Sequence, residues 1–435
     1  MTLLPLPGAR SDRPAVTGPL VSRTVPIPLS LAHDLLAVMP SAPATDLVSW
    51  VRRGEGFVGW GQVASVTTTG ESRFTDAEAW WQALVANAQV QDEVQVAGTG
   101  PIALGSFSYS ADSTDGATLT VPQVVVGRRG DRAWVTTMGV GAAPETPQLD
   151  ASPPEQPIGI RFADGALSSP KWATVVREAV ERITAGELDK VVLARDLSVD
   201  ADSPIDIRWL LARLAERYDN TWVFAVDGLV GATPELLVRL DKGLVHSRVL
   251  AGTIRRTGDD EHDLALAASL ARSSKDLEEH EYAVRSVADA LRPHCFSMNV
   301  PEAPFVLHLT NVMHLATDVA GALGDRTTSL TLAASLHPSA AVCGTPTAKA
   351  DAVIADIEGM DRGRYAGPVG WMDASGDGEW GIALRCGTLT DDPARMRIFA
   401  GCGIVAGSNP EAEVAESDAK FIPMRDALTA PPLPS

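Results

Sequence analysis

The sequence predicts a large protein that combines β-sheets with helices, organised as one big domain or as two. The chain has 435 residues, of which 45% are hydrophobic and 21% are charged, and this is enough to bury a sizeable core. Short apolar runs separated by glycine, such as residues 47–51 and 56–61, are typical of strands. Longer segments that repeat apolar residues on one helical face, such as 77–88 and 169–185, are typical of amphipathic helices.

Composition divides the chain into parts. Residues 1–20 are rich in Pro, Gly and Arg, and we expect them to form a disordered lead. Nothing in residues 21–158 suggests chemistry, so their expected role is to complete a sheet. Five prolines within residues 142–157 indicate a linker or a long surface crossing. The residue patterns that point to chemistry lie in the remaining part, 159–435.

The charge of the chain excludes some partners. A formal net charge of -19 argues against binding to nucleic acid or to anionic membranes, and an anionic substrate would need cations supplied locally. No run of 18 apolar residues is present, and the N-terminus lacks the features of a signal peptide. The four cysteines form no C-x-x-C pair, as expected for thiols in a reducing cytoplasm. Because no amphipathic seam stands out, a monomer is expected.

The first candidate for chemistry lies near the end of the chain. A strand over 396–400 leads into Gly401-Cys402-Gly403, which predicts a turn with bare backbone N–H groups, and Asn409 then caps a helix. Spacings of three and four residues place three charged side chains on one face of that helix: Glu413, Glu416 and Lys420. This pattern favours a metal-and-carboxylate site. The alternative is an exposed helix face that carries ordinary ion pairs.

A second carboxylate pair lies on the helix predicted over 274–291. Asp276 and Glu279 are three residues apart and share a face. If this helix faces the first, the two pairs could hold a hard divalent cation with oxygen ligands. The alternative is a solvated acidic face, which would suit a chain this acidic.

Three further side chains are candidates from their local sequence. Lys190 stands at the mouth of a strand over 191–199, either as a solvated lysine or as a base. Glu235 follows Thr-Pro among apolar neighbours, either as an edge-strand carboxylate in water or as a general acid kept protonated by an apolar wall. Arg385 alternates with apolar residues on a predicted strand, which indicates a bidentate contact with an anion.

Taken together, these residues resemble the chorismate-utilising enzymes, and among them the isochorismate synthases. The resemblance covers roughly residues 169–428. It rests on seven motifs in the family's order: Lys190-Val-Val-Leu-Ala-Arg, Gly231-Ala-Thr-Pro-Glu-Leu-Leu, Leu250-Ala-Gly-Thr, Lys275-Asp-x-x-Glu-His, His337-Pro to Gly344-Thr-Pro, Arg362-Gly-x-Tyr-Ala-Gly and Gly401-x-Gly-Ile to Lys420. One departure is Ser339-Ala340, where the family commonly has Thr-Pro.

The resemblance implies a single α+β domain in which antiparallel sheets pack around a central active site with helices outside. Residues 21–158 and 159–435 would then form one integrated unit. It also implies Mg²⁺ bound to a ring carboxylate of the substrate, chorismate. At the matching positions Glu279 and Glu416 would ligate the metal, and Asp276 and Glu413 would support it through water.

Further roles follow from the resemblance. Arg385 and Tyr365 would hold the carboxylate of the enolpyruvyl side chain, and Lys420 with the Gly401 and Gly403 backbone would hold the ring carboxylate. Three more residues are assigned to substrate binding: Gly252 and Thr253 in the Leu250-Ala-Gly-Thr motif, and His314 in the run Val312-Met-His-Leu-Ala-Thr, although a single histidine is more often a satisfied core residue.

The resemblance also implies the reaction. Relatives that install ammonia usually have Gln where Lys190 stands, so a lysine there goes with water as the nucleophile. Lys190 would deprotonate water that attacks ring carbon 2, and Glu235 would protonate the hydroxyl group leaving carbon 4, giving isochorismate for menaquinone or siderophore biosynthesis. The alternatives are a salicylate synthase, an anthranilate or aminodeoxychorismate synthase component, and an inactive chorismate-binding relative.

Overall fold

The computed structural model describes residues 18–149, 152–308 and 312–431, without the side chains of Thr253, Lys275 and Glu279. Within these residues the strands form two large sheets, one of 13 strands and one of 10, and every strand pairing is antiparallel except that of β1 with β5. The larger sheet runs in the order β10-β11-β23-β22-β13-β12-β2-β3-β8-β9-β1-β5, with β19 paired to β11. The smaller runs β16-β18-β15-β14-β21-β20-β6-β7-β4, with β17 paired to β18.

The elements have the following bounds. The strands of the larger sheet are β1 (Leu20–Pro26), β2 (Leu47–Arg52), β3 (Glu55–Trp60), β5 (Gln89–Asp92), β8 (Val124–Arg129), β9 (Arg132–Val140), β10 (Arg161–Asp164), β11 (Lys190–Asp200), β12 (Trp222–Val226), β13 (Leu229–Thr233), β19 (Gly344–Thr345), β22 (Cys386–Leu389) and β23 (Arg395–Ile404). Those of the smaller sheet are β4 (Ala64–Thr68), β6 (Ile102–Phe107), β7 (Ala117–Val121), β14 (Leu236–Asp241), β15 (Leu244–Arg255), β16 (Cys295–Asn299), β17 (Phe305–His308), β18 (Val312–Leu323), β20 (Pro368–Asp373) and β21 (Gly378–Ile382). The helices are α1 (Arg73–Val85), α2 (Ser169–Thr184), α3 (Ile207–Arg217), α4 (Asp260–Leu270), α5 (Ser274–Leu291), α6 (Ser329–Ser335), α7 (Thr347–Ile357) and α8 (Pro410–Thr429), with short 3₁₀ turns η1 (Leu29–Ala32) and η2 (Ala44–Asp46).

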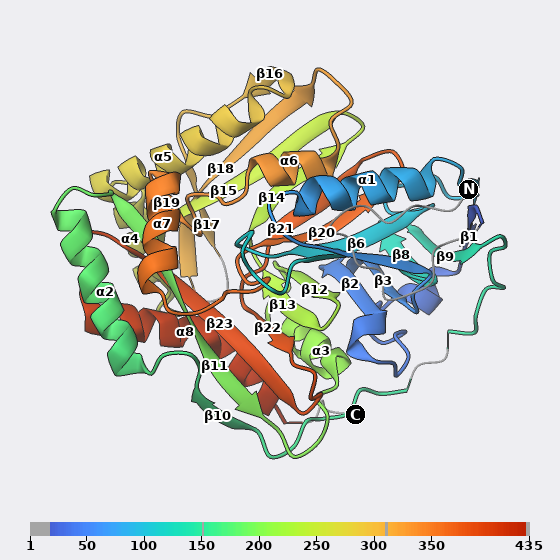
Figure 1. Ribbon diagram of the computed structural model, residues 1–435, viewed down its shortest axis with the longest axis horizontal. Coiled ribbons are helices and arrows are strands. Elements are labelled where there is room, and N and C mark those ends of the chain that lie inside the picture. The colour runs from blue at the N-terminus through green and yellow to red at the C-terminus, as the bar shows by residue number, and fades with distance from the viewer. Residues whose placement is uncertain (1–17, 150–151, 309–311, 432–435) are drawn as a thin grey trace.

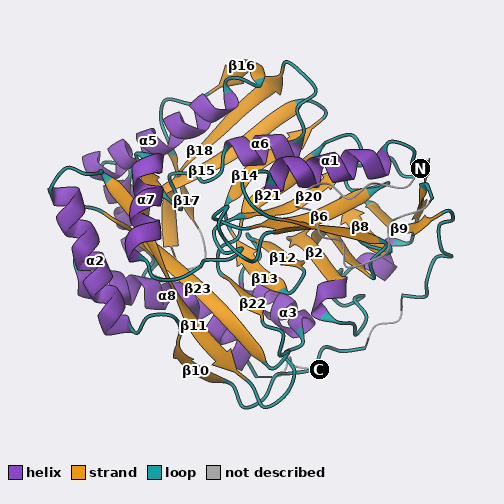
Figure 2. Ribbon diagram, viewed as in Figure 1, coloured by secondary structure: helices purple, strands orange, loops and turns teal. Residues whose placement is uncertain are grey.

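The two sheets share a hydrophobic core, and helices cover their other faces (Figure 1, Figure 2). Phe57 of the larger sheet meets Trp371 of the smaller edge to face, with ring centroids 5.3 Å apart, a favoured aromatic geometry. Helices α1, α5 and α6 pack on the smaller sheet, and α2, α3 and α8 pack on the larger. A second apolar cluster lies between the larger sheet and α3 and α8. The predicted α+β class with antiparallel sheets and outer helices is confirmed.

Strands from the first part of the chain enter both sheets. In the larger sheet β2 pairs with β12, and in the smaller sheet β6 pairs with β20. The described residues between β9 and β10 contain no strand or helix, as the five prolines predict. Most of the expected disordered lead lies outside the described residues, but its last predicted residue, Leu20, is fully buried and begins β1.

Most predicted elements are present, with shifted ends. Helix α2, strand β11 and helix α5 match their predicted positions, and Asn409 caps α8 by accepting a hydrogen bond from the Ala412 N–H at 2.9 Å. Helix α1 starts at Arg73 rather than at residue 77, because its first turn is polar and adds little to the apolar stripe that located it. Among the described residues, no helix combines the length and the apolar character needed to cross a bilayer.

Candidate active site

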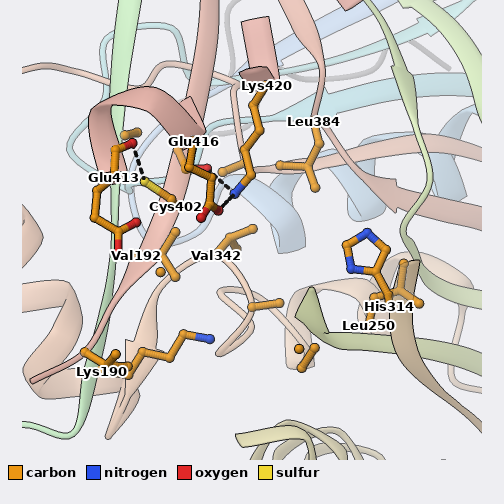
Figure 3. Close-up of a pocket in the computed structure, with 18 of the residues that line it drawn as sticks. Lys190, Val192, Leu250, His314, Val342, Leu384, Cys402, Glu413, Glu416 and Lys420 are labelled. Carbon is orange, nitrogen blue, oxygen red and sulfur yellow. Dashed lines mark hydrogen bonds and ion pairs between the residues drawn. The ribbon is translucent and has the colours of Figure 1, made fainter. Parts of the chain in front are cut away.

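One cavity of about 440 Å³ collects the predicted site residues. Its walls come from both sheets, from α5 and α8, and from the loops between strands. Figure 3 shows Lys190 reaching in from one side, with Glu416 and Lys420 across from it and His314 on a third side. Twelve of the predicted residues line the cavity: Lys190, Glu235, Gly252, Asp276, His314, Tyr365, Arg385, Gly401, Gly403, Glu413, Glu416 and Lys420. The side chains of the other two, Thr253 and Glu279, lie outside the described part of the structure.

The glycines at 401 and 403 do not form the predicted turn. Both lie inside β23, which pairs with β11 up to Ile404, and neither has a positive φ. Instead, the absence of a Cβ atom at these two positions lets neighbouring groups lie close to the strand backbone. A Cβ on Gly401 would lie 2.8 Å from the Leu193 carbonyl oxygen and 3.1 Å from the Tyr365 hydroxyl, and one on Gly403 would lie 2.9 Å from Lys190 Cε. The pair therefore lets the strand backbone form a wall of the cavity without side chains.

Glu235 lies where the chain passes from one sheet to the other, between β13 and β14. Burial raises the pKa of this carboxyl group from 4.5 to about 7, although the charges of Arg385, Lys190 and Lys420 act in the opposite direction. Desolvation disfavours the ionised form of a carboxyl group, and here it outweighs three cations. Glu235 is therefore a partly protonated acid at neutral pH and not an edge-strand carboxylate in water.

Arg385 lies at another of the crossings between the sheets, in the connection from β21 to β22. The predicted strand ends before it, because Arg385 has a left-handed backbone with φ of 49°. Burial lowers the pKa of its guanidinium, against the influence of Tyr365 and Glu235. Within the described residues this guanidinium makes no hydrogen bond or ion pair. A half-buried guanidinium in that state, on the wall of the cavity, can bind an anion.

Two neutral groups complete this side of the cavity. Burial lowers the pKa of His314 to about 3, helped by Arg385 and Lys420, so the imidazole is neutral, and it hydrogen-bonds the Gly252 backbone. Tyr365 stacks on Phe399 with ring centroids 5.2 Å apart, and burial raises the pKa of its hydroxyl above the usual value. Both groups can donate or accept hydrogen bonds without adding charge.

The acidic pair of α8 faces the cavity beside Lys420. The Lys420 ammonium donates to the Gly401 carbonyl at 2.8 Å and pairs with Glu416 Oε1 at 2.7 Å. Glu413 Oε2 is buried and makes no hydrogen bond in the described part of the structure. Burial raises the pKa of Glu413, and the neighbouring Glu416 raises it further.

These residues suit a divalent cation. The carboxylates of Glu413 and Glu416 and the Cys402 thiol offer donor atoms that lie within 4.8 Å of one another, and Asp276 of α5 lines the same cavity. The orphaned Glu413 oxygen and the predominance of carboxylates fit Mg²⁺, which prefers oxygen ligands. Cys402 was assigned no role from the sequence, although this residue lies between the two glycines of a motif assigned to the site.

Comparison with known proteins agrees with this geometry. The family model described as "Chorismate binding enzyme" matches residues 14–429. The chain belongs to the chorismate-binding enzymes. It is 37% identical over 341 residues to isochorismate synthase DhbC of Bacillus subtilis, an alignment that spans 75% of this chain and 81% of that protein. It is 38% identical over 345 residues to the putative isochorismate synthase MenF of Mycobacterium tuberculosis, across 76% of this chain and 87% of the relative.

A solved structure extends the comparison to the fold. The putative 2,3-dihydroxybenzoate-specific isochorismate synthase DhbC of Bacillus anthracis superposes with a TM-score of 0.74 at 32% identity, and covers 92% of this chain and 99% of that one. The chain is therefore an enzyme of the chorismate-utilising family, and the resemblance read from seven motifs is confirmed.

Proposed function

We propose that the protein is an isochorismate synthase. The observation that carries the proposal is that Lys190 and Glu235 line one cavity, with Glu235 poised as an acid by a pKa of about 7. A base and an acid on one substrate are what the exchange of a ring hydroxyl group requires. The relatives named as isochorismate synthases support the same reaction class.

The proposed reaction balances as an isomerisation. The Lys190 amine takes a proton from water as its oxygen bonds to ring carbon 2, and the two ring double bonds each shift by one position. The bond from carbon 4 to its hydroxyl oxygen breaks, and Glu235 gives its proton to the leaving group. One water molecule enters and one leaves, so no external oxidant or reductant is needed.

Substrate binding is proposed from the same cavity. Arg385 and Tyr365 would hold the enolpyruvyl carboxylate, because the Arg385 guanidinium makes no other hydrogen bond within the described residues and a fork of N–H donors fits a carboxylate. Lys420 and the β23 backbone at Gly401 and Gly403 would hold the ring carboxylate. Contacts with the rest of the substrate fall to Gly252, Thr253 and His314.

Magnesium would be held by Glu416 and Glu279, with Glu413 and Asp276 acting through water. When bound, the ion supplies positive charge that neutralises the ring carboxylate and orients it. The remaining work belongs to the chain: it fixes the ring between Lys190 and Glu235 and limits access of bulk water.

Product analysis tests the proposal. The purified protein is incubated with chorismate and magnesium, and the products are separated by HPLC. Isochorismate alone is expected. Salicylate with pyruvate would indicate a salicylate synthase, an aminated ring in the presence of ammonia would indicate an anthranilate-type enzyme, and unchanged chorismate would indicate an inactive relative.

We further propose that the protein is a monomer and that it is cytoplasmic. The cytoplasmic location fits the four cysteines, which are all free thiols.

A further inference from the structure

Strand β11 has an edge that no described strand completes. This edge pairs with β19 at residues 190–191 and with β10 at residues 197–200, and neither partner reaches the residues between. The other edge of β11 pairs continuously with β23. Backbone groups at the gap are buried, and buried N–H and C=O groups need partners. The gap lies two residues from Lys190 and faces the cavity wall.

Side chains and one loop take the place of the missing strand. The Val192 carbonyl accepts a hydrogen bond from Arg362 Nη2 at 2.7 Å, and the Ala194 N–H donates to Glu358 Oε2 at 2.8 Å. The Ala194 carbonyl accepts from Trp172 Nε1 at 2.9 Å. The Val192 N–H donates to the carbonyl of residue 343 at 2.8 Å. Each of these backbone groups of β11 is thus satisfied.

Arg362 and Glu358 form the centre of this arrangement. Two parallel bonds of 2.6 Å join the guanidinium to the carboxylate, and the two side chains are only 3% and 1% exposed. The guanidinium also donates to the Val342 carbonyl at 2.9 Å. A buried pair of this kind is weak evidence for stability, because apolar residues of similar volume often replace such pairs without loss. Its geometry is therefore of more interest than its energy.

The pair joins three segments of the cavity wall. The first is β11, which begins with Lys190; the second is the loop at Val342; the third is the loop that leads from Arg362 to Tyr365, whose N–H donates to the Arg362 carbonyl at 3.1 Å. A rigid bidentate pair at their junction fixes the distances among them. Sub-ångström placement of a catalytic group can change a rate by orders of magnitude.

We propose that Arg362 and Glu358 are positioning residues that act through Lys190, by fixing the open edge of β11 against the cavity wall so that the amine meets the water to be activated. The proposal rests on the proposed role of Lys190. Arg362 and Glu358 need not touch the reacting atoms, and their effect should appear in kcat and not in substrate affinity.

The test is a double-mutant cycle between Arg362→Lys and Lys190→Gln. Lysine keeps the charge but cannot bond Glu358, Val192 and Val342 together. We expect Arg362→Lys alone to lower kcat roughly 10- to 10²-fold, with the calorimetric Kd for chorismate changed by less than about threefold. In the Lys190→Gln background the same substitution should lower single-turnover isochorismate formation by less than about twofold, because the amine that it positions is gone.

Two further variants test whether a loss of kcat comes from the contacts with β11 and not from a general effect on the fold. Arg208→Lys alters an ion pair of similar burial, with Arg208 4% exposed and 2.6 Å from Asp206, that does not line the cavity, and it should leave kcat unchanged. If Arg362→Lys does not fold, Trp172→Phe removes the donor to Ala194 together with part of a buried indole ring, and it should lower kcat several-fold, again only when Lys190 is present.

The outcomes separate the two proposals. Equal losses with and without Lys190, or an unchanged kcat for folded Arg362→Lys and Trp172→Phe, would overturn the positioning role and leave the proposed function intact. A near-normal rate for Lys190→Gln alone would overturn the proposed function itself. A large rise in the chorismate Kd with kcat preserved would show that Arg362 serves binding, and would also overturn the positioning role.

Discussion

Replacing Glu235 by glutamine should inactivate the enzyme and yet stabilise its fold at alkaline pH. Glutamine has nearly the same shape as a protonated glutamate but never carries a charge. Burial raises the pKa of Glu235 from 4.5 to about 7. One pKa unit corresponds to about 1.4 kcal/mol, so the ionised carboxylate destabilises the folded state by about 3 kcal/mol once the pH exceeds 7.

The sign follows from proton counts. Between pH 4.5 and about 7 the folded protein holds the Glu235 proton and the unfolded chain has already lost it, so stability due to this group falls as the pH rises through that window. Glu235→Gln removes this loss. For 435 residues the entropy of unfolding is about 0.9 kcal/mol/K. At pH 8.5 the variant should therefore melt about 3 °C higher than the native protein, and at pH 4.5 the two proteins should melt at the same temperature.

Thermal melting of both proteins across pH 4.5–9 measures this difference. Glu181→Gln, on the exposed surface of α2, is the matched control, and its melting temperature should differ from that of the native protein by the same amount at every pH.

The same samples give the rate of isochorismate formation. Isochorismate formation should fall roughly 10²- to 10⁴-fold in Glu235→Gln, and in the native enzyme kcat/KM, which reports the free enzyme, should decline as the pH rises through about 7. A melting difference that is constant with pH, or a variant that keeps its rate, would refute the assignment of Glu235 as a general acid with a raised pKa.

Three other substitutions test the cavity. Lys190→Gln should lower single-turnover isochorismate formation roughly 10²- to 10⁴-fold with calorimetric chorismate binding retained; a rate near the original would return Lys190 to a solvated lysine. Arg385→Lys should weaken chorismate binding roughly tenfold or more, because the bidentate fork is lost while the charge remains; an unchanged KM would make Arg385 merely structural. Gly403→Ala puts a methyl group 2.9 Å from Lys190 Cε, so kcat should fall at least roughly tenfold while the melting temperature moves little; normal turnover would show that the amine has room to move.

The fold could be predicted from the sequence wherever one pattern dominated. Helix α5 was located by the apolar stripe of its second half and strand β11 by its run of apolar residues, and Asn409 marked the start of α8 as a capping residue. The allocation of strands to two sheets could not be predicted in this way. Consecutive strands β13 and β14 belong to different sheets, and nothing local distinguishes a crossing between sheets from an ordinary turn.

The site was predictable as a set of residues but not as a geometry. Motif order identified Lys190 and Glu235, whereas the pKa of Glu235 depends on burial that only the packed structure supplies. Gly401 and Gly403 predicted a turn because glycine tolerates positive φ, but in the structure the property of glycine that matters is the missing Cβ. Arg362 stood in a recognised motif, and its role in closing the edge of β11 depends on contacts with residues 170 positions away.

The charges around the cavity imply that magnesium and chorismate bind cooperatively. Among the described side chains that line the cavity, four are basic (Lys190, Arg362, Arg385 and Lys420) and four are acidic (Glu235, Asp276, Glu413 and Glu416). The lining is therefore close to neutral, and Lys420 already pairs with Glu416 at 2.7 Å. A dianion gains little from such a lining until a divalent ion occupies the carboxylates. Saturating magnesium should therefore tighten chorismate binding by roughly 10- to 10²-fold in calorimetry, and chorismate should tighten magnesium binding by the same factor. Activity should vanish with EDTA, and Glu416→Gln should lose most of the coupling while it stays folded. Equal chorismate affinity with and without magnesium would mean that the acidic pair of α8 is an ordinary charged helix face.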